Sequence, residues 1–179
     1  MRKFIKNVEG YVSYCSQNFI VLNSVITHTC ALLKSFAEKD MMHEGIVYWV
    51  GYETANLKVV TTCITPNAIT TVGSFDTDEV ANADVIRELS QWKSVLLAQV
   101  HSHPGRIVDH SDGDNERAFM PFNGFLSVVV PNYAARGMLP LTVNGFHLYH
   151  GGHFFRLSDR VVSKVISIVP NFVDMRSRR

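Results

Sequence analysis

The sequence has no excess of either charge and no long apolar run. Its 17 lysines and arginines against 16 aspartates and glutamates give a formal net charge of +1. Proteins that bind nucleic acid normally carry a large basic excess, so no nucleic-acid partner is expected. No apolar run approaches the ~20 residues of a membrane-spanning helix. The basic start of the chain, residues 1–4, is not followed by the apolar core of a signal peptide. We therefore expect a soluble, cytoplasmic protein with no membrane partner.

Cysteine is also scarce in this chain. Cys15, Cys30 and Cys63 stand far apart and form no Cys-x-x-Cys pair. This spacing excludes a zinc site built from thiolates and argues against a disulfide framework. We expect three reduced cysteines that pack mostly as small hydrophobic side chains.

No repeat, low-complexity stretch or Pro/Gly/Ser-rich linker divides the 179 residues. The hydrophobic fraction of 46%, with 11% aromatic residues, is enough for a core. A chain of this length fits one domain. We predict a single domain over residues 1–179, with a core over about 19–157, a C-terminal helix over 158–169 and a solvated basic tail over 170–179.

Alternating runs of strand-type and helix-type sequence predict the fold class. β-Branched and aromatic runs predict strands over 19–22, 45–50, 57–64, 95–100, 124–130, 141–149 and 153–156. Helices are predicted from Asn23 or Ser24 through Glu38, from Asp76 or Thr77 onward, and briefly within 111–119. In the second helix we expect an inner face made of Val80, Ala83, Ile86 and Leu89. The prediction is an α/β fold, a single layered domain with a mixed, mainly antiparallel sheet flanked by helices.

The most informative stretch is His101-Ser102-His103-Pro104, followed by Ser111 and Asp114. Histidines two residues apart on a strand project from the same face, so both imidazoles can reach one ion. Pro104 ends the strand there and leaves the pair at an edge. Asp114 falls near the start of a predicted helix and could supply a third ligand. Two histidines, one carboxylate and an open position make up the donor set of a catalytic zinc.

A lone His-x-His pair is more often a surface or core-edge pair than a metal site. The complete pattern fixes five positions, with Ser111 eight residues and Asp114 eleven residues after His103. At average residue usage it arises by chance at about one in ten million start positions, or roughly one in a hundred thousand chains of this length.

With Glu44 upstream, this pattern resembles the JAMM (JAB/MPN+) metallopeptidases. The segment Glu44-Gly-Ile-Val-Tyr-Trp-Val-Gly51 is similar to the family's strand of glutamate, apolar run and glycine. Residues 124–132 resemble the strand after the motif in compact prokaryotic members. The resemblance implies a JAB/MPN fold of the cytidine-deaminase-like type. No large insertion of the kind that selects polyubiquitin linkages in eukaryotic relatives is evident.

The resemblance also implies a role for each matched residue. His101, His103 and Asp114 would hold one Zn²⁺ per chain, and Glu44 would act as general base toward a water. The Ser111 hydroxyl would stabilise the oxyanion that forms on the substrate carbonyl. A Ser-His-Asp triad that uses Ser111 is the alternative, but no Gly-x-Ser-x-Gly elbow exposes this hydroxyl.

Other histidines and carboxylates lie close to the motif in sequence. Asp109, His110 and Asp112 could compete as ligands, although the family spacing selects Asp114. A second metal site is suggested by three further histidines, but their spacing in a hairpin does not keep them on one face. These three are His147, His150 and His153, and we expect them to be partly exposed residues flanking a turn.

The expected function is a zinc-dependent isopeptidase or peptidase that cleaves after the C-terminal glycine of a ubiquitin-like protein. Compact JAMM relatives are associated with prokaryotic ubiquitin-like conjugation systems, including anti-phage operons, so activating and conjugating enzymes of the same operon are expected partners. The alternatives are hydrolysis of aminoacyl adducts on a ubiquitin-fold sulfur carrier, a non-catalytic scaffold module, or a DNA-repair-associated JAB protein. The near-neutral charge disfavours the last of these.

Overall fold

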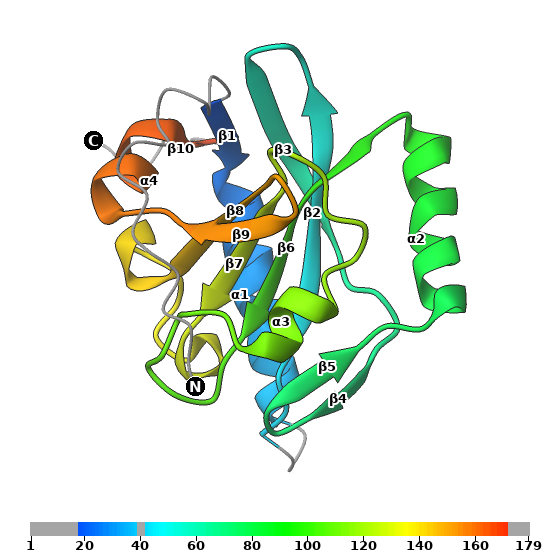
Figure 1. The fold of residues 1–179 in the computed structure, drawn as a ribbon, viewed down its shortest axis with the longest axis vertical. Helices are drawn as coiled ribbons and strands as arrows, with labels where there is room; N and C mark the ends of the chain where they lie inside the picture. The colour runs from blue at the N-terminus through cyan, green and yellow to red at the C-terminus, as the bar shows by residue number, and fades with distance from the viewer. Residues whose placement is uncertain (1–17, 39–41, 172–179) are drawn as a thin grey trace, which may run out of the picture.

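Eight strands of the computed structural model, which describes residues 18–38 and 42–171, form one mixed sheet (Figure 1). Their order is β10-β1-β3-β2-β6-β7-β8-β9. The pairs β10–β1, β1–β3 and β6–β7 are parallel, and the other four neighbouring pairs are antiparallel. This arrangement confirms the predicted α/β fold with a mixed, mainly antiparallel sheet. The strands of the sheet are β1 (Asn18–Leu22), β2 (Ile46–Glu53), β3 (Leu57–Ile64), β6 (Val95–Ser102), β7 (Leu126–Val130), β8 (Gly145–His150), β9 (His153–Arg156) and β10 (Ile166–Val169).

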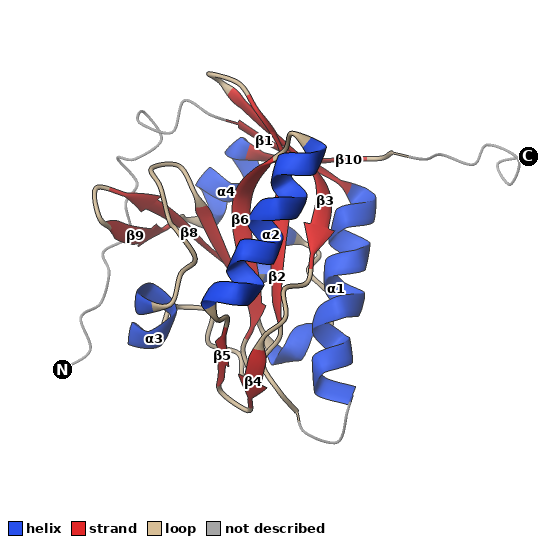
Figure 2. Cartoon of the chain, turned by 90° about the vertical axis from the view of Figure 1, so that its right-hand side faces the viewer, coloured by secondary structure: helices blue, strands red, loops and turns tan. Residues whose placement is uncertain are grey.

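The two long helices cover opposite faces of the sheet, as β2 shows most clearly. Val47 and Trp49 of β2 belong to the core cluster that includes residues of α1, whereas Ile46 and Tyr48 belong to the cluster that includes residues of α2. Because successive side chains of a strand point to opposite faces, α1 and α2 must lie on different sides (Figure 2). The helices are α1 (Asn23–Glu38), α2 (Glu79–Trp92), α3 (Asp112–Glu116) and α4 (Asp159–Val165), with short 3-10 turns at Asn132–Ala134 and Leu141–Val143.

The predicted inner face of α2 is wrong at most of its positions. Val80 is 69% exposed and Ile86 is 44% exposed, while the buried residues are Ala81, Val85 and Leu89. An α-helix turns about 100° per residue, so each three-residue step falls 60° short of a full turn. Val80 therefore lies opposite Leu89, and the four-residue spacing of the buried residues keeps them together.

The predicted C-terminal helix over 158–169 is also corrected. Helix α4 ends at Val165, and Ile166–Val169 forms β10, which pairs in parallel with β1. Val169 precedes Pro170, and a residue before proline disfavours the helical conformation. The edge of β1 supplies the backbone partners that an isolated sequence segment cannot reveal. The basic tail lies outside the described residues from 172 onward.

A small hairpin that the sequence did not predict stands next to the main sheet. Strands β4 (Ile69–Thr71) and β5 (Ser74–Asp76) pair only with each other, as a two-stranded sheet. The backbone N–H of Glu44 donates to the Thr71 carbonyl at 2.8 Å, which fixes this hairpin beside the start of β2. In the described part of the chain, none of the helices combines the length and the hydropathy needed to cross a membrane.

Candidate metal centre

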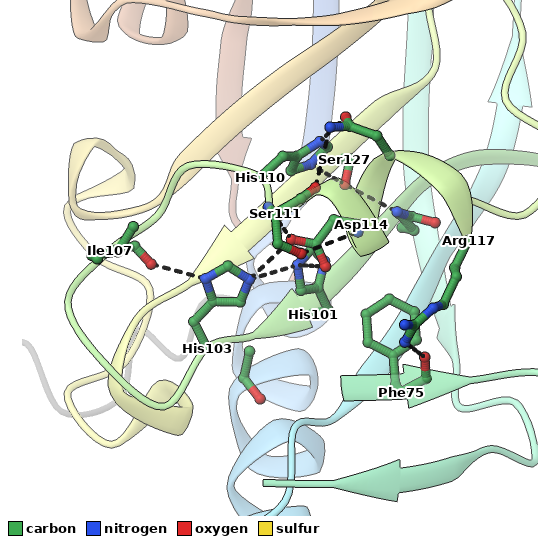
Figure 3. A network of polar contacts seen from close by, with 12 residues as sticks. Phe75, His101, His103, Ile107, His110, Ser111, Asp114, Arg117 and Ser127 are labelled. Atoms are coloured by element: carbon green, nitrogen blue, oxygen red, sulfur yellow. Dashed lines mark hydrogen bonds and ion pairs between the residues drawn. The ribbon is translucent and has the colours of Figure 1, made fainter. Parts of the chain in front are cut away.

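The C-terminal end of β6 brings the two motif histidines together, with His101 in the strand and His103 directly after it. His101 and His103 project from the same side of the strand, and their Nε2 atoms lie 3.2 Å apart (Figure 3). His101 is fully buried, while His103 retains a small exposed surface. The backbone of His103 is still held to β7, since its N–H donates to the Val130 carbonyl at 2.9 Å. The strand spacing predicted this convergence.

Asp114 reaches the same point from α3. Its Oδ1 lies 3.3 Å from Nε2 of His101, and its Oδ2 lies 3.3 Å from Nε2 of His103. A capping box holds the carboxylate, because the backbone N–H of Ser111 donates to Oδ2 at 2.7 Å while the Asp114 N–H donates to the Ser111 Oγ at 3.2 Å. The first turn of α3 thus orients Asp114 toward β6.

These three side chains fit a divalent cation. In a tetrahedral zinc site with bonds of about 2.0–2.1 Å, neighbouring ligand atoms lie roughly 3.3–3.4 Å apart. The two Nε2 atoms lie 3.2 Å apart, close to that spacing, and each lies 3.3 Å from a different oxygen of the Asp114 carboxylate, Oδ1 for His101 and Oδ2 for His103. Among the described residues, His101, His103 and Asp114 are the group of three whose ligand atoms lie within 4.8 Å of one another. Imidazole nitrogen and carboxylate oxygen together suit zinc and other transition metals.

Hydrogen bonding around His103 prepares its ring for such a role. Its Nδ1 lies 2.9 Å from the Ile107 carbonyl, to which it can only donate. This bond holds one proton on Nδ1, so Nε2 is the nitrogen that donates to Asp114 when the ring is protonated and that is available to a metal ion when the ring is neutral. The Nδ1 of His101 is buried and has no hydrogen-bond partner within the described residues.

The charges of the three groups depend on one another. Burial alone would raise the pKa of Asp114, but hydrogen bonds from His101 and His103 outweigh it and hold that pKa far below its usual range. Burial would lower the pKa of His103, yet the hydrogen bond to Asp114 raises it. Burial lowers the pKa of His101. The site therefore holds an ionised carboxylate between two imidazoles, a charge pattern that favours a cation.

Glu44 lies at the entrance to this group, just before β2. Register places Ile46 opposite His101, and Ser102 closes the junction by accepting from the Gly45 N–H at 2.9 Å. Glu44 is only 4% exposed, and burial raises the pKa of its carboxyl group to about 7, with the charge of His103 acting in the opposite direction. A carboxylate with a pKa near neutrality can both accept and return a proton.

The three competing ligands lie elsewhere. Asp109 pairs with Arg156 of β9, and Asp112 is exposed on α3. His110 turns away from the metal-ligating group, with Nε2 at 2.9 Å from the Ser127 Oγ and Nδ1 at 3.0 Å from the Asn115 Oδ1. Asp114 is thus the carboxylate that geometry brings to the histidines. The roles of the five predicted site residues remain predictions.

The expectation for His147 is wrong. It is 1% exposed, and its ring stacks on that of His110 with centroids 3.9 Å apart. Burial lowers the pKa of both rings and is the main reason that the pKa of His110 is lowered to about 4. The charge of His101 lowers the pKa of His110 further, and the charge of His110 does the same to the pKa of His147. His147 pairs with Ser127 in the sheet interior, whereas His150 and His153 lie at the turn and are partly or fully exposed. His147 points into the sheet interior, whereas His150 and His153 lie beside the turn. The spacing of the three histidines in the sequence did not reveal this difference.

Two residues near the centre were not singled out from the sequence. Arg117 follows α3, and its Nη1 lies 3.5 Å from the Phe75 carbonyl of β5. Tyr133 has a left-handed backbone with φ of 51°, and its hydroxyl donates to the Val72 carbonyl at 2.9 Å. Both tie the β4–β5 hairpin to the centre. The sequence signals neither, because the hairpin itself was not predicted.

Comparison with known proteins supports the class of this site. No family model matches the chain. The chain is 30% identical over 130 residues to the probable metalloprotease y4jG of Sinorhizobium fredii, an alignment that covers 70% of this chain and 80% of that protein. The chain therefore belongs to the family of this probable metalloprotease, and the His-His-Asp group is of a kind that could hold the metal ion of such a protein.

The fold has a counterpart among solved structures. The solution structure of protein DSY2949 from Desulfitobacterium hafniense matches with a TM-score of 0.62 at 13% sequence identity. The match covers 90% of this chain and 98% of that one. At this identity the likeness concerns the fold alone.

Proposed function

We propose that this protein is a JAMM-type zinc isopeptidase or peptidase that cleaves after the C-terminal glycine of a ubiquitin-like protein. The observation that carries the proposal is the convergence of His101, His103 and Asp114 beside a buried glutamate of raised pKa, Glu44. Membership in a metalloprotease family supports the reaction class. A bacterial ubiquitin-like conjugation or anti-phage system in the cytoplasm is the proposed setting, with its activating and conjugating enzymes as partners.

Each of the five predicted site residues has a defined task in this proposal. His101, His103 and Asp114 would hold the zinc, which supplies Lewis-acid polarisation of the carbonyl and of a water. Glu44 accepts a proton from the attacking water and returns it to the leaving amine. The Ser111 Oγ already accepts from the Asp114 N–H, so its own proton is free to stabilise the developing oxyanion.

The β4–β5 hairpin supports a substrate with an extended tail. It stands beside Glu44, and as a two-stranded sheet of its own it offers an edge to which a tail can add as a further strand. Glycines in such a tail need little width next to the centre, which favours a ubiquitin-like C-terminus.

Cleavage of a substrate panel tests the proposal. Ubiquitin-like proteins extended past their terminal glycine are incubated with wild-type protein, with protein plus chelator, and with Glu44→Ala, and the products are identified by mass spectrometry. We expect cleavage directly after the glycine, abolished by the chelator and in the variant. Cleavage that survives Glu44→Ala would contradict the mechanism. Zinc-loaded protein that cleaves no substrate would contradict the substrate class and favour the scaffold alternative.

A further inference from the structure

A small cavity lies between the β4–β5 hairpin and α3, next to the candidate metal centre. Its volume is about 140 Å³, and its walls are residues 73–75 of the hairpin together with Ser111, Gly113, Asp114 and Arg117. Because Ser111 and Asp114 also belong to the centre, whatever fills this cavity lies beside the reacting bond. A cavity of ~150 Å³ accommodates a group about the size of benzene. The cavity therefore fits one small residue and not a folded chain.

Arg117 gives this cavity a positive wall. Figure 3 shows its side chain running from α3 to the backbone of Phe75, where Nη1 lies 3.5 Å from the carbonyl oxygen. In the part of the chain that the structure describes, Arg117 forms no ion pair. A Cβ on Gly113 would lie 3.3 Å from the Arg117 Nη2, so the glycine leaves room for the guanidinium. Most of the guanidinium's five donors thus remain available to a ligand.

Among the described residues, neither of the two carboxyl groups near Arg117, those of Asp114 and Glu44, forms an ion pair with it. Asp114 is engaged by the two histidines and by the Ser111 N–H. Burial raises the pKa of Glu44, and the charges of His103 and Arg117 act in the opposite direction, so Arg117 lies within electrostatic range of the proposed base. A planar guanidinium binds a carboxylate through two parallel hydrogen bonds. A carboxylate is therefore the ligand chemistry that this wall fits.

We propose that the cavity binds the leaving residue of the substrate, and that Arg117 holds its free α-carboxylate. This inference rests on the proposed function. Hydrolysis breaks the C–N bond after the glycine, adds the oxygen of water to the acyl carbon and transfers a proton to the leaving amine, while the carboxylate on Arg117 is unchanged. A lysine within a protein target has no free carboxylate near its ε-amine. The geometry therefore favours the release of a single small C-terminal residue over deconjugation from a protein.

Two peptides that differ only in their C-terminal group test the inference. Both end in Gly-Gly-Ala, one with a free C-terminal acid and the other with a carboxamide, and kcat/KM for release of the last residue is measured with zinc-loaded protein. We expect about a ten- to hundredfold preference for the acid, the range of a hydrogen bond to a charged group. Arg117→Met should reduce the ratio to near one, while Arg160→Met, an exposed arginine of α4, should preserve it.

The outcomes separate this inference from the proposed function. Cleavage of both peptides after glycine at equal rates would overturn the carboxylate subsite and leave the peptidase intact. An acid preference that persists in Arg117→Met would overturn the assignment of Arg117. Binding of the two peptides to Glu44→Gln protein, followed by titration calorimetry, gives a readout that needs no turnover. Tighter binding of the acid that depends on Arg117 supports the subsite, and equal binding of acid and amide overturns it.

Discussion

Glu44 shows how the chemistry of one residue depends on where the backbone places it. Its carboxyl group is buried beside His103, and burial raises its pKa to about 7. In water a glutamate would be ionised at neutral pH and a weak base. Desolvation makes it a stronger base, and a nearby cation would counteract part of that change. This balance makes Glu44 suited to move a proton in both directions.

The first prediction concerns the pH dependence of the reaction. In the proposed mechanism the ionised form of Glu44 is the active one, so kcat/KM should fall as the pH drops through the pKa of this group. Because burial raises that pKa to about 7 and bound zinc would lower it, the acid limb should lie below pH 7. Glu44→Gln should reduce kcat by about 10²–10⁴-fold. Initial rates between pH 5 and 8 check this, and a rate that rises on acidification would contradict the role of Glu44.

Ser111 caps α3, and the proposed mechanism gives its hydroxyl a second role, which a pair of substitutions can separate from the first. Its Oγ caps α3, so Ser111→Ala should cost about 1 kcal/mol of unfolding free energy. Loss of the hydroxyl donor should also reduce kcat by roughly 10²-fold. Ser111→Thr retains both the cap and the donor and should restore most of the rate. Urea unfolding and kcat measured on the same preparations check this. A Ser111→Ala protein with wild-type kcat would leave only the capping role.

The sequence predicted the residues of the centre better than their surroundings. The i, i+2 spacing places His101 and His103 on one face because strand geometry fixes it locally. Arg117 was not singled out and His147 was expected to be partly exposed, since their environments depend on β5 and β7, which are distant in the sequence. Local periodicity determines which way a side chain points, and the remote segment that it meets is determined by the whole sheet.

At the scale of elements, the centre depends on the junction of β6, α3 and β8. His110 precedes the N-cap of α3 and stacks on His147 of β8 while it contacts Ser127 of β7. Burial keeps both rings neutral by lowering their pKa values. The loop that leads to Asp114 is therefore attached to the far half of the sheet through two uncharged imidazoles.

This pair predicts a loss of stability in acid. The unfolded chain takes up protons on histidine near pH 6.5, whereas folded His110 takes one up only near pH 4. The unfolded state thus binds more protons between these values, and the free energy of unfolding should fall as the pH drops from about 6.5 toward 4. His147→Phe should weaken this dependence, and the exposed His153→Gln should not. The measurement is the urea midpoint of metal-stripped wild type and both variants at pH 7 and at pH 5. An equal drop in the midpoint between these pH values in all three proteins would refute the prediction.

The elements that the sequence misassigned share one cause. Helix α2 was predicted to begin near its actual start, but its buried face is defined by the sheet that it covers. The residues of β10 continue an apolar pattern suited to a helix, and only the free edge of β1 makes them a strand. The β4–β5 hairpin is too short for a periodic signal. Long elements with strong local patterns were predictable, and edges were not.

For the whole molecule, the order of the strands creates the site. Glu44 and His101 are far apart in the sequence, and the antiparallel pairing of β2 with β6 brings them together. The three proposed ligands come from β6 and α3, which are joined by a single loop, while the two core clusters lie on the faces of the sheet. Metal binding would therefore add stability to a fold that its hydrophobic core already holds together.

Because the proposed ligands are not part of the two core clusters, we can predict how metal removal acts on the folded protein. A ligand that binds only the native state adds RT ln(1 + [L]/Kd), about 2.7 kcal/mol at a free concentration of 100 Kd. Zinc should raise the Tm of wild-type protein, and a chelator should lower it without unfolding the protein at 25 °C.

Asp114→Asn should abolish the zinc-dependent rise, because the amide is a poor ligand and breaks the contacts to both histidines. The exposed neighbour Asp112 provides the matched control, since Asp112→Asn should keep the full rise. Thermal unfolding followed by circular dichroism, with and without zinc, checks both variants. A rise that persists in Asp114→Asn would place the metal elsewhere, and unfolding by the chelator alone would show that the metal holds the fold together.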